Sequence, residues 1–240
     1  MILKDISFDL PEENILFDEV LLQLAEEGRV EDVLRFWESN RYFIVLGRIG
    51  RFEEEINLAQ VKADHIPVLR RSSGGGTVLQ GPGCLNYSLI LSKLNNPEIA
   101  DLKRSYQYIL GKVVNALKSA GIDSTYLPIS DIALKDSARK ISGNAQKRGR
   151  NFILHHGTVL YDFNLSLIEQ YLSMPKTMPE YRNKRKHLDF VENARTNSDQ
   201  INRCLIQEFE VHHKNLAIDR YEKERLKKSA ANNKIILEIL

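Results

Sequence analysis

Three consecutive glycines limit what this chain can fold into more than any other feature. They lie in the run Arg71-Ser72-Ser73-Gly74-Gly75-Gly76-Thr77-Val78-Leu79, which follows an apolar stretch that ends at Leu69. Glycine has no Cβ, so such a run weakens a helix or a strand but suits a sharp turn that a ligand approaches closely. Successive N–H groups in such a turn can bind an anion. The run predicts a cradle for a carboxylate or a phosphate, and a plain glycine-rich turn is the alternative.

Two common nucleotide-binding loops do not fit this run. A Walker A loop needs a Lys-Ser/Thr pair after its last glycine, and this chain has Thr77-Val78 there. A dinucleotide-binding fingerprint needs G-x-G-x-x-G at the start of a helix. Gly81-x-Gly83 instead leads into Leu85–Leu91, whose alternating pattern is that of a strand.

Residue periodicity indicates an α+β fold. Helices are predicted from Pro11 to about Gly28, from Ser105 to Ala120, from Leu165 to Tyr171 and after a cap at Ser198. The segments expected to form strands are Val33–Trp37, Tyr42–Gly47, Pro67–Arg70, Leu85–Leu91, Ile132–Leu134, Arg139–Ser142 and Phe152–Tyr161.

The character of the chain changes after Pro175. Arg182–Lys186 is a basic run without an apolar period. A charged helix is expected from Arg220 to Lys228, and Ile235–Leu237 is an apolar end.

Composition excludes several functional classes. The 240 residues are 42% hydrophobic and 28% charged with a net charge of +2, which predicts a folded core but no contact with nucleic acid or membranes. The sequence has no apolar stretch long enough to span a bilayer and no signal-peptide core, so a cytoplasmic location is expected. Cys84 and Cys204 form neither a disulfide framework nor a metal-binding spacing. The adjacent histidine pairs also lack the spacing of zinc ligands.

A second run identifies the family that the chain resembles. Arg139-Lys140-Ile141-Ser142-Gly143-Asn144-Ala145-Gln146 is followed by His155-His156-Gly157-Thr158-Val159-Leu160. Together with the glycine run, and in this order, they resemble the lipoate–protein ligase A family, which belongs to a superfamily with the octanoyltransferases and biotin–protein ligases. The resemblance covers about residues 10–175. It implies a mainly antiparallel or mixed sheet with flanking helices, and a single catalytic domain over residues 1–240 with a helical part at 176–240.

The resemblance also implies a reaction. ATP with Mg²⁺ would activate lipoate, or octanoate, as an acyl-adenylate, and the acyl group would then pass to a lysine of an acceptor protein. The acceptors implied are lipoyl-domain proteins, namely the E2 subunits of 2-oxoacid dehydrogenases and the H protein of glycine cleavage.

Individual site residues follow from the same resemblance. Lys140 matches the lysine that bridges the acyl carbonyl and the phosphate. The residues that match the ATP- or adenylate-binding loop are Arg71, Ser72, Ser73, Gly74, Gly75, Gly76, Thr77, Val78 and Leu79. Asp131 would orient Lys140 or Mg²⁺, or would only cap a turn. Of the two adjacent histidines, one would contact the ligand or its loop, with His156 the candidate, while the other packs. No dedicated metal ligands are expected.

Two departures from the family leave alternatives open. Only 80 residues follow Leu160, too few for the usual accessory domain, so a separately encoded partner or a preformed acyl donor is an alternative to a complete ligase. Octanoyltransferases of the superfamily use a cysteine near the lysine strand, and residues 126–157 contain none. A thiolate mechanism would have to use Cys84.

A member of the family that binds its ligand without turnover is the non-enzymatic alternative. The basic run Arg182–Lys186 is a candidate contact for the acceptor protein.

Overall fold

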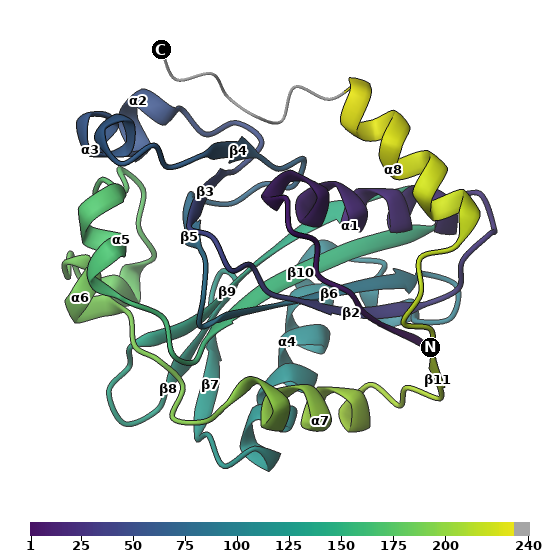
Figure 1. Ribbon diagram of the computed structural model, residues 1–240. Helices are drawn as coiled ribbons and strands as arrows, with labels where there is room; N and C mark the ends of the chain where they lie inside the picture. The colour runs from purple at the N-terminus through teal and green to yellow at the C-terminus, as the bar shows by residue number, and fades with distance from the viewer. Residues whose placement is uncertain (233–240) are drawn as a thin grey trace.

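A mixed eight-stranded sheet runs through the centre of the molecule (Figure 1). The structure is a computed structural model that describes residues 1–232. The strand order is β11-β1-β2-β6-β10-β9-β8-β7, in which β1 pairs in parallel with both β2 and β11 and the other pairs are antiparallel. The strands are β1 (Ile2–Asp5), β2 (Val33–Trp37), β6 (Cys84–Ser92), β7 (Ser124–Leu127), β8 (Asp131–Leu134), β9 (Lys140–Arg148), β10 (Phe152–Leu160) and β11 (His213–Lys214).

A second, three-stranded sheet carries the glycine run. Its order is β4-β3-β5, with bounds β3 (Phe43–Leu46), β4 (Val68–Arg70) and β5 (Val78–Gln80). Strand β3 pairs in parallel with β4 and antiparallel with β5. The glycine loop, defined as residues 71–77, therefore connects the two edges of this sheet across β3.

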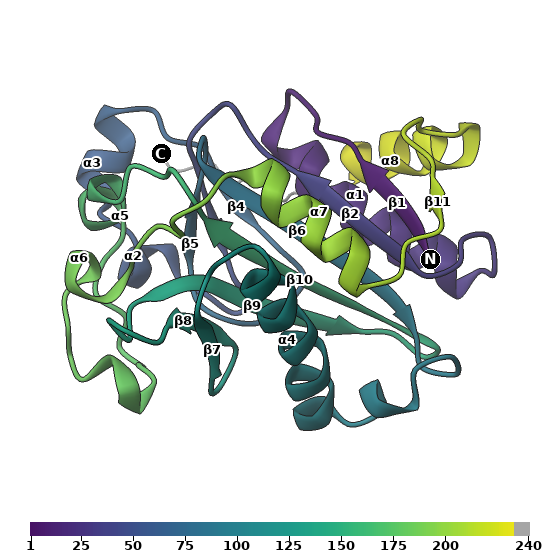
Figure 2. The ribbon, with the colours of Figure 1, turned by 90° about the horizontal axis from the view of Figure 1, so that it is seen from below.

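Helices cover both faces of the large sheet (Figures 1 and 2). Helix α1 (Pro11–Glu26) lies on one face with α8 (Arg220–Asn232) beside it, and α4 (Leu102–Ser119) and α7 (Ser198–Glu208) lie on the other. The short elements are α2 (Phe52–Glu55), α3 (Leu58–Ala63), α5 (Ser166–Tyr171), α6 (His187–Phe190) and the 3₁₀ turns η1 (Pro97–Ile99) and η2 (Glu180–Arg182).

This layering explains the pattern of β6. All nine of its residues are buried, because odd positions such as Leu89 face α4 and α7 while even positions such as Ile90 face α1. On the α1 face, Ser88 and its polar neighbours Asp18 and Arg35 bond to one another. Ser88 donates a hydrogen bond to Asp18, whose other carboxylate oxygen lies 2.6 Å from the fully buried Arg35.

The structure confirms the α+β class predicted from the sequence, and most predicted elements lie within a few residues of their expected bounds. Strand Val33–Trp37 agrees at both ends. The expected Ser198 cap is wrong by one residue, because the side chain of Asn197 accepts the hydrogen bond from the Gln200 amide. Val78 and Leu79, expected in the glycine loop, belong to strand β5. The apolar end Ile235–Leu237 lies outside the described residues.

Strands β1, β5, β7 and β11 were not predicted. Strand β11 has only two residues and an exposed, polar sequence, so it has no strand pattern of its own. It forms because the chain after α7 returns to the edge of β1, where Ile2 pairs with His213. Within residues 1–232 no helix is both long and apolar enough to cross a membrane.

A buried ion pair fastens α8 to the start of the chain. Lys4 Nζ on β1 lies 2.8 Å from Glu222 Oε1, and both side chains are almost completely buried. Lys4 also donates to the Ala217 carbonyl, and Glu222 Oε2 accepts from the Asp219 amide. Glu222 is therefore the counter-ion of the buried Lys4 ammonium.

Glu222→Ala should destabilise the fold by about 3–5 kcal/mol, because it leaves an uncompensated charge buried on β1. Urea denaturation at neutral pH measures this free energy of unfolding. The double variant Lys4→Met/Glu222→Leu, which removes both charges, should regain most of the loss. A loss of less than about 1 kcal/mol for Glu222→Ala, the size of a surface pair, would contradict the assignment.

Candidate active site

The carbonyl groups of Gly74 and Gly76 in the glycine loop turn inward toward Arg71. This guanidinium, itself buried, donates to the carbonyls of Gly74 at 2.7 Å and Gly76 at 2.8 Å, to Val45 O and to Ser73 Oγ. Burial lowers the pKa of Arg71 to about 10, so the side chain stays cationic at neutral pH. These four bonds show Arg71 ordering the loop, and its contact with the nucleotide stays a prediction.

The backbone N–H groups of residues 72–77 in the loop, unlike the Gly74 and Gly76 carbonyls, have no internal hydrogen-bond partner in the part of the chain that the structure describes. Gly74, Gly75 and Gly76 are exposed, whereas Ser72 and Thr77 are half-buried. Free donors on an exposed turn whose carbonyls point inward are what an anion cradle requires.

Two glycines let the loop pack closely on its neighbours. A Cβ on Gly47, just after β3, would overlap the carbonyl oxygen of Gly75. Gly75 itself has φ +89°, a conformation that favours glycine. Gly74 and Gly76 have open space around them and no such φ.

The loop rests on strands β9 and β10. Ser73 Oγ lies 2.7 Å from His156 Nε2, and a Cβ at Gly75 would lie 3.8 Å from Ala145 Cβ. His156 and Ala145 are paired across the two strands, so both face the loop.

Lys140 reaches the same face of β9. Its Nζ would lie 2.8 Å from a Cβ on Gly143, and Gly143 and Ala145 point to one side because they are two residues apart on a strand. The ammonium lies 2.8 Å from Asp131 Oδ1 on β8. This is the contact expected of an orienting carboxylate.

The two adjacent histidines lie on opposite faces. His155 is completely buried, with its ring stacked on Tyr87 and edge-on to Tyr106. His156 is half-buried and contacts the loop through Ser73. Burial lowers the pKa of each imidazole to about 3, and the Arg71 cation adds to this at His156. Both rings are therefore neutral at neutral pH.

Other predicted residues lie further from the loop surface. Leu79 is buried in the core beside the small sheet, and Val78 is half-buried against the α1 core. Because the Leu79 side chain is buried, only its backbone could contact a ligand.

Three polar residues near the site were not singled out from the sequence, and one of them, Asn144, points to the face of β9 opposite Gly143. Glu55 on α2 accepts a hydrogen bond from the Thr77 hydroxyl. Asn144 accepts from the Tyr87 hydroxyl and donates to Ser130 O at 2.8 Å. Tyr181 donates to Asp131 Oδ2 at 2.6 Å. Asn144 lies inside the second motif, but nothing near Glu55 or Tyr181 in the sequence indicates these contacts.

The basic run Arg182–Lys186 is only partly a surface feature. Arg182 is buried, and its guanidinium lies over the Phe190 ring at 4.5 Å. Arg185 also lies over Phe190 and donates to the carbonyls of Ala138 and Tyr181. Of the run's cations only Lys184 and Lys186 are exposed, so the candidate contact for the acceptor narrows to these two lysines.

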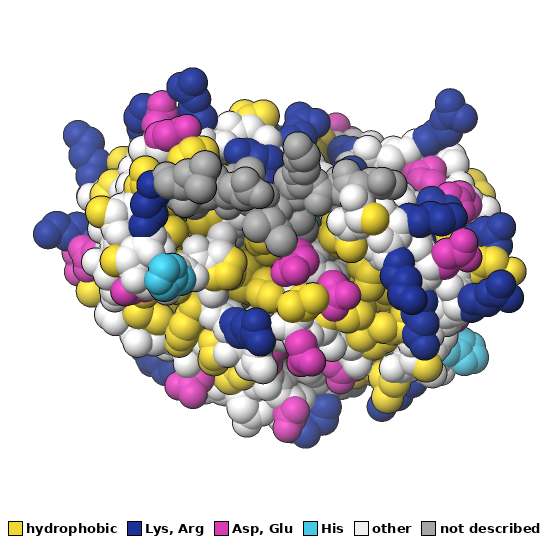
Figure 3. All heavy atoms as spheres, turned by 45° about the horizontal axis from the view of Figure 1, so that its top comes forward, with side chains coloured by type: hydrophobic (Ala, Val, Ile, Leu, Met, Phe, Trp, Pro, Cys, Tyr) yellow, Lys and Arg dark blue, Asp and Glu magenta, His cyan; other side chains and the backbone are white. Residues whose placement is uncertain are grey.

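Charge on the face formed by the small sheet and α1 is mixed. Lys and Arg side chains lie around its rim among Asp and Glu, with hydrophobic side chains between them (Figure 3). On the described part of this face the view shows no broad patch of one sign, in keeping with the nearly balanced net charge.

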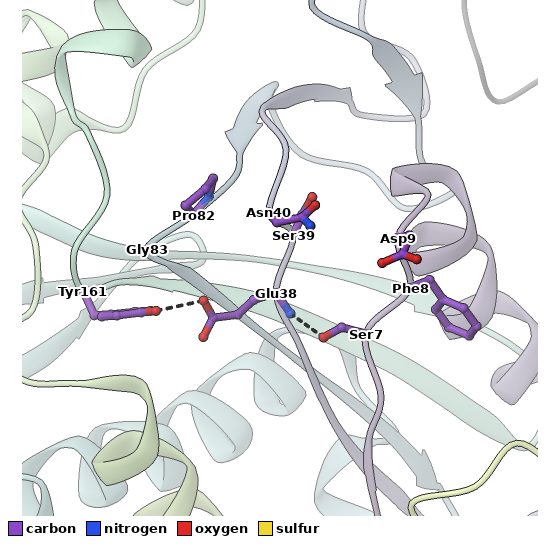
Figure 4. A pocket seen from close by; sticks show the side chains of 9 residues that line it. All are labelled: Ser7, Phe8, Asp9, Glu38, Ser39, Asn40, Pro82, Gly83 and Tyr161. Atoms are coloured by element: carbon purple, nitrogen blue, oxygen red, sulfur yellow. Dashed lines mark hydrogen bonds between the residues drawn. The ribbon is translucent and has the colours of Figure 1, made fainter.

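A separate cavity of about 390 Å³ lies between residues 7–9, residues 38–40, Pro82, Gly83 and Tyr161 (Figure 4). In it Glu38 accepts a hydrogen bond from the Tyr161 hydroxyl at 2.8 Å, and its backbone amide donates to Ser7 Oγ at 3.0 Å. Burial raises the pKa of Glu38. None of the predicted site residues lines this cavity.

The profile of the lipoyl protein ligase A/B catalytic domain matches residues 10–210. The chain belongs to this family. The match includes the glycine loop, Asp131, Lys140 and the histidine pair, which the structure brings to adjacent strands and loops.

Relatives within the family carry two kinds of name. The chain is 31% identical over 169 residues to "Probable lipoate-protein ligase A" of Mycoplasma pneumoniae, covering 70% of this chain and 48% of that protein. It is 27% identical over 197 residues to "Octanoyltransferase LipM" of Oceanobacillus iheyensis, covering 76% and 71%. Both names denote acyl-transferring enzymes. The chain spans about half the length of the M. pneumoniae ligase.

A solved structure shares the family fold over nearly the whole chain. The archaeal protein from Thermoplasma acidophilum, described as a bi-partite lipoate protein ligase studied with its E2 lipoyl domain, superimposes with a TM-score of 0.81. The match covers 97% of this chain and 92% of that one at 21% sequence identity. At this identity the likeness concerns the fold.

Gly75→Ala should destabilise the protein by about 1–2 kcal/mol, because an L-residue at φ +89° is strained and its Cβ would meet Arg71 Nη2 at 3.0 Å. Gly76→Ala is the matched control and should change the free energy of unfolding by less than about 0.5 kcal/mol. Chemical denaturation of both variants measures the difference. Equal effects at the two positions would mean that the loop is not held as described.

Proposed function

We propose that this chain attaches lipoate to a specific lysine of lipoyl-domain proteins through a lipoyl-adenylate intermediate. One observation carries the proposal: the Lys140 ammonium, paired with Asp131 at 2.8 Å, lies on the same face of β9 as a glycine loop whose amides are free. A cation next to an array of N–H donors suits a reaction in which negative charge develops on a carboxylate, a phosphate and a tetrahedral acyl centre.

The proposed chemistry has two steps. In the first, the lipoate carboxylate attacks the α-phosphate of ATP and pyrophosphate leaves. In the second, the amine of the acceptor lysine attacks the acyl carbonyl and AMP leaves. Lys140 bridges the acyl carbonyl and the phosphate, and the amides of residues 72–77 hold phosphate or carboxylate oxygens. His156, neutral and fixed by Ser73, faces the loop from β10.

Magnesium has no dedicated protein site in this scheme. Within residues 1–232 no group of three Asp, Glu, His or Cys side chains is arranged to hold a metal ion. Both carboxylate oxygens of Asp131 are already engaged, by Lys140 and by Tyr181. Mg²⁺ would therefore come with the phosphates of ATP, and Asp131 acts on Lys140.

An octanoyltransferase mechanism through a cysteine is the competing candidate, because relatives such as the O. iheyensis protein bear that name. The burial of the thiols argues against it. Cys84 is 1% exposed, burial raises its pKa, and its thiol donates to Gln80 Oε1 at 3.3 Å. Cys204 is buried on α7 against the α4 core. A buried thiol with a raised pKa is a poor nucleophile.

The proposed partners are a lipoyl-domain acceptor and a separate accessory subunit. The acceptors would be the E2 subunits of 2-oxoacid dehydrogenases and the glycine cleavage H protein. A separate accessory subunit is proposed because the T. acidophilum protein of the same fold is described as bi-partite. Lys184 and Lys186, exposed beside the segment that carries Tyr181, are candidate contacts for an acidic acceptor.

Lys140→Ala should lower adenylate formation by on the order of a hundredfold to a thousandfold, as the loss of one oxyanion donor does. Pyrophosphate release from ATP and lipoate measures it, and transfer from supplied lipoyl-adenylate to a lipoyl domain measures the second step. Lys135→Ala is the control, because this exposed lysine lies in the β8–β9 turn and pairs with Asp123. Wild-type rates for Lys140→Ala in both assays would remove Lys140 from the reaction.

A further inference from the structure

The lysine strand is held by a segment far away in the sequence. Residues 180–192 include η2 and α6 and lie beside the β8–β9 hairpin (Figure 1). The backbone of Val191 forms a parallel bridge with Lys140, and the Glu192 amide donates to Lys140 O at 2.9 Å. This segment therefore fixes the backbone of Lys140.

The same segment also acts on the side chain of Lys140, through the carboxylate of Asp131. The Tyr181 hydroxyl donates to Asp131 Oδ2 at 2.6 Å, and Asp131 Oδ1 lies 2.8 Å from Lys140 Nζ. Burial and the neighbouring carboxylate raise the pKa of Tyr181, so its hydroxyl keeps the proton that it donates. Asp131 is only 8% exposed, and a buried carboxylate depends on such partners.

A rigid cluster holds Tyr181 in place. Its ring lies 5.3 Å from the ring of Phe190, which is also covered by the guanidinium groups of Arg182 and Arg185. Arg185 donates to Tyr181 O at 3.1 Å and to Ala138 O at 3.0 Å in the hairpin turn. Arg185 thus fastens the tyrosine to the hairpin on which Asp131 and Lys140 lie, while Arg182 packs on the Phe190 side of the cluster.

We propose that Tyr181 is a positioning residue for Lys140: its hydroxyl fixes the Asp131 carboxylate, which in turn holds the ammonium over Gly143 on the glycine-loop face of β9. Tyr181 touches neither substrate nor reacting atoms and acts only through Asp131. The inference rests on the proposed function in one respect, namely that Lys140 carries the chemistry.

The chain offers a matched control in Tyr171 on α5. Its hydroxyl also donates to a carboxylate, Asp64 Oδ2 at 2.8 Å, but in contacts between α3 and α5 away from Lys140. Tyr171→Phe and Tyr181→Phe therefore remove the same kind of hydrogen bond from two places.

The kinetic test is a double-mutant cycle on pyrophosphate release. Tyr181→Phe should lower kcat by about tenfold, in the range caused by losing one hydrogen bond to a charged group, with KM for ATP and lipoate changed by less than about twofold. In the Asp131→Asn background, Tyr181→Phe should have no further effect, because residues that act through one another are not additive. Tyr171→Phe should leave kcat unchanged. The same loss from Tyr181→Phe in both backgrounds, or no loss in either, would overturn the proposal.

A second measurement needs no enzymatic activity. Reductive methylation of the substrate-free protein, followed by peptide mass spectrometry, reports how accessible the Lys140 amine is. Methylation of Lys140 should be severalfold faster in Tyr181→Phe and Asp131→Asn than in wild type and Tyr171→Phe, with Lys147, paired with Glu19 at 3.2 Å, as the internal reference. Equal rates in all four proteins would overturn the positioning role.

Failure of the wild-type chain to release pyrophosphate or to use lipoyl-adenylate would count against the proposed function alone.

Discussion

A lysine at the start of an inner strand can project over the neighbouring residues only if there is room for its side chain and a partner for its charge. In this protein Gly143 supplies the room and Asp131 supplies the negative charge, 2.8 Å from Lys140 Nζ. The backbone of Lys140 is held by Glu192, and Asp131 is held by Tyr181. The hairpin of β8 and β9 and the segment 180–192 thus both contact the ion pair of Lys140 and Asp131.

The glycine loop depends on a second buried cation. Arg71 draws the carbonyls of Gly74 and Gly76 inward, and this leaves the amides of the loop without internal acceptors among the described residues. Because the guanidinium donates only to neutral groups, its own charge is not cancelled within the loop. The loop and Lys140 together place two cationic side chains on one face of β9 and β10, next to the neutral imidazole of His156. Such a site is suited to bringing a carboxylate and a polyphosphate together, which otherwise repel each other.

Much of this could be predicted from the sequence because it is encoded locally. Apolar periodicity placed strand Val33–Trp37 and the α1 and α4 helices, and the two motif runs located Lys140 and the glycine loop. Contacts between distant segments could not be predicted in the same way. Tyr181 reaches Asp131 across 50 positions of sequence, and β11 exists only because β1 offers an edge. The arginines of the basic run resemble solvated residues in sequence, and only the fold shows that they cover Phe190.

The most direct test is the intact mass of a lipoyl domain and of this chain after incubation with supplied lipoyl-adenylate or with octanoyl carrier protein, for wild type and for Cys84→Ala/Cys204→Ala. Supplying the adenylate makes the result independent of any accessory subunit. The account predicts that both proteins acylate the acceptor from lipoyl-adenylate and that neither carries an acyl group itself. Acylation from the carrier protein alone, with a thioester on the wild-type chain that the cysteine-free variant cannot form, would contradict it.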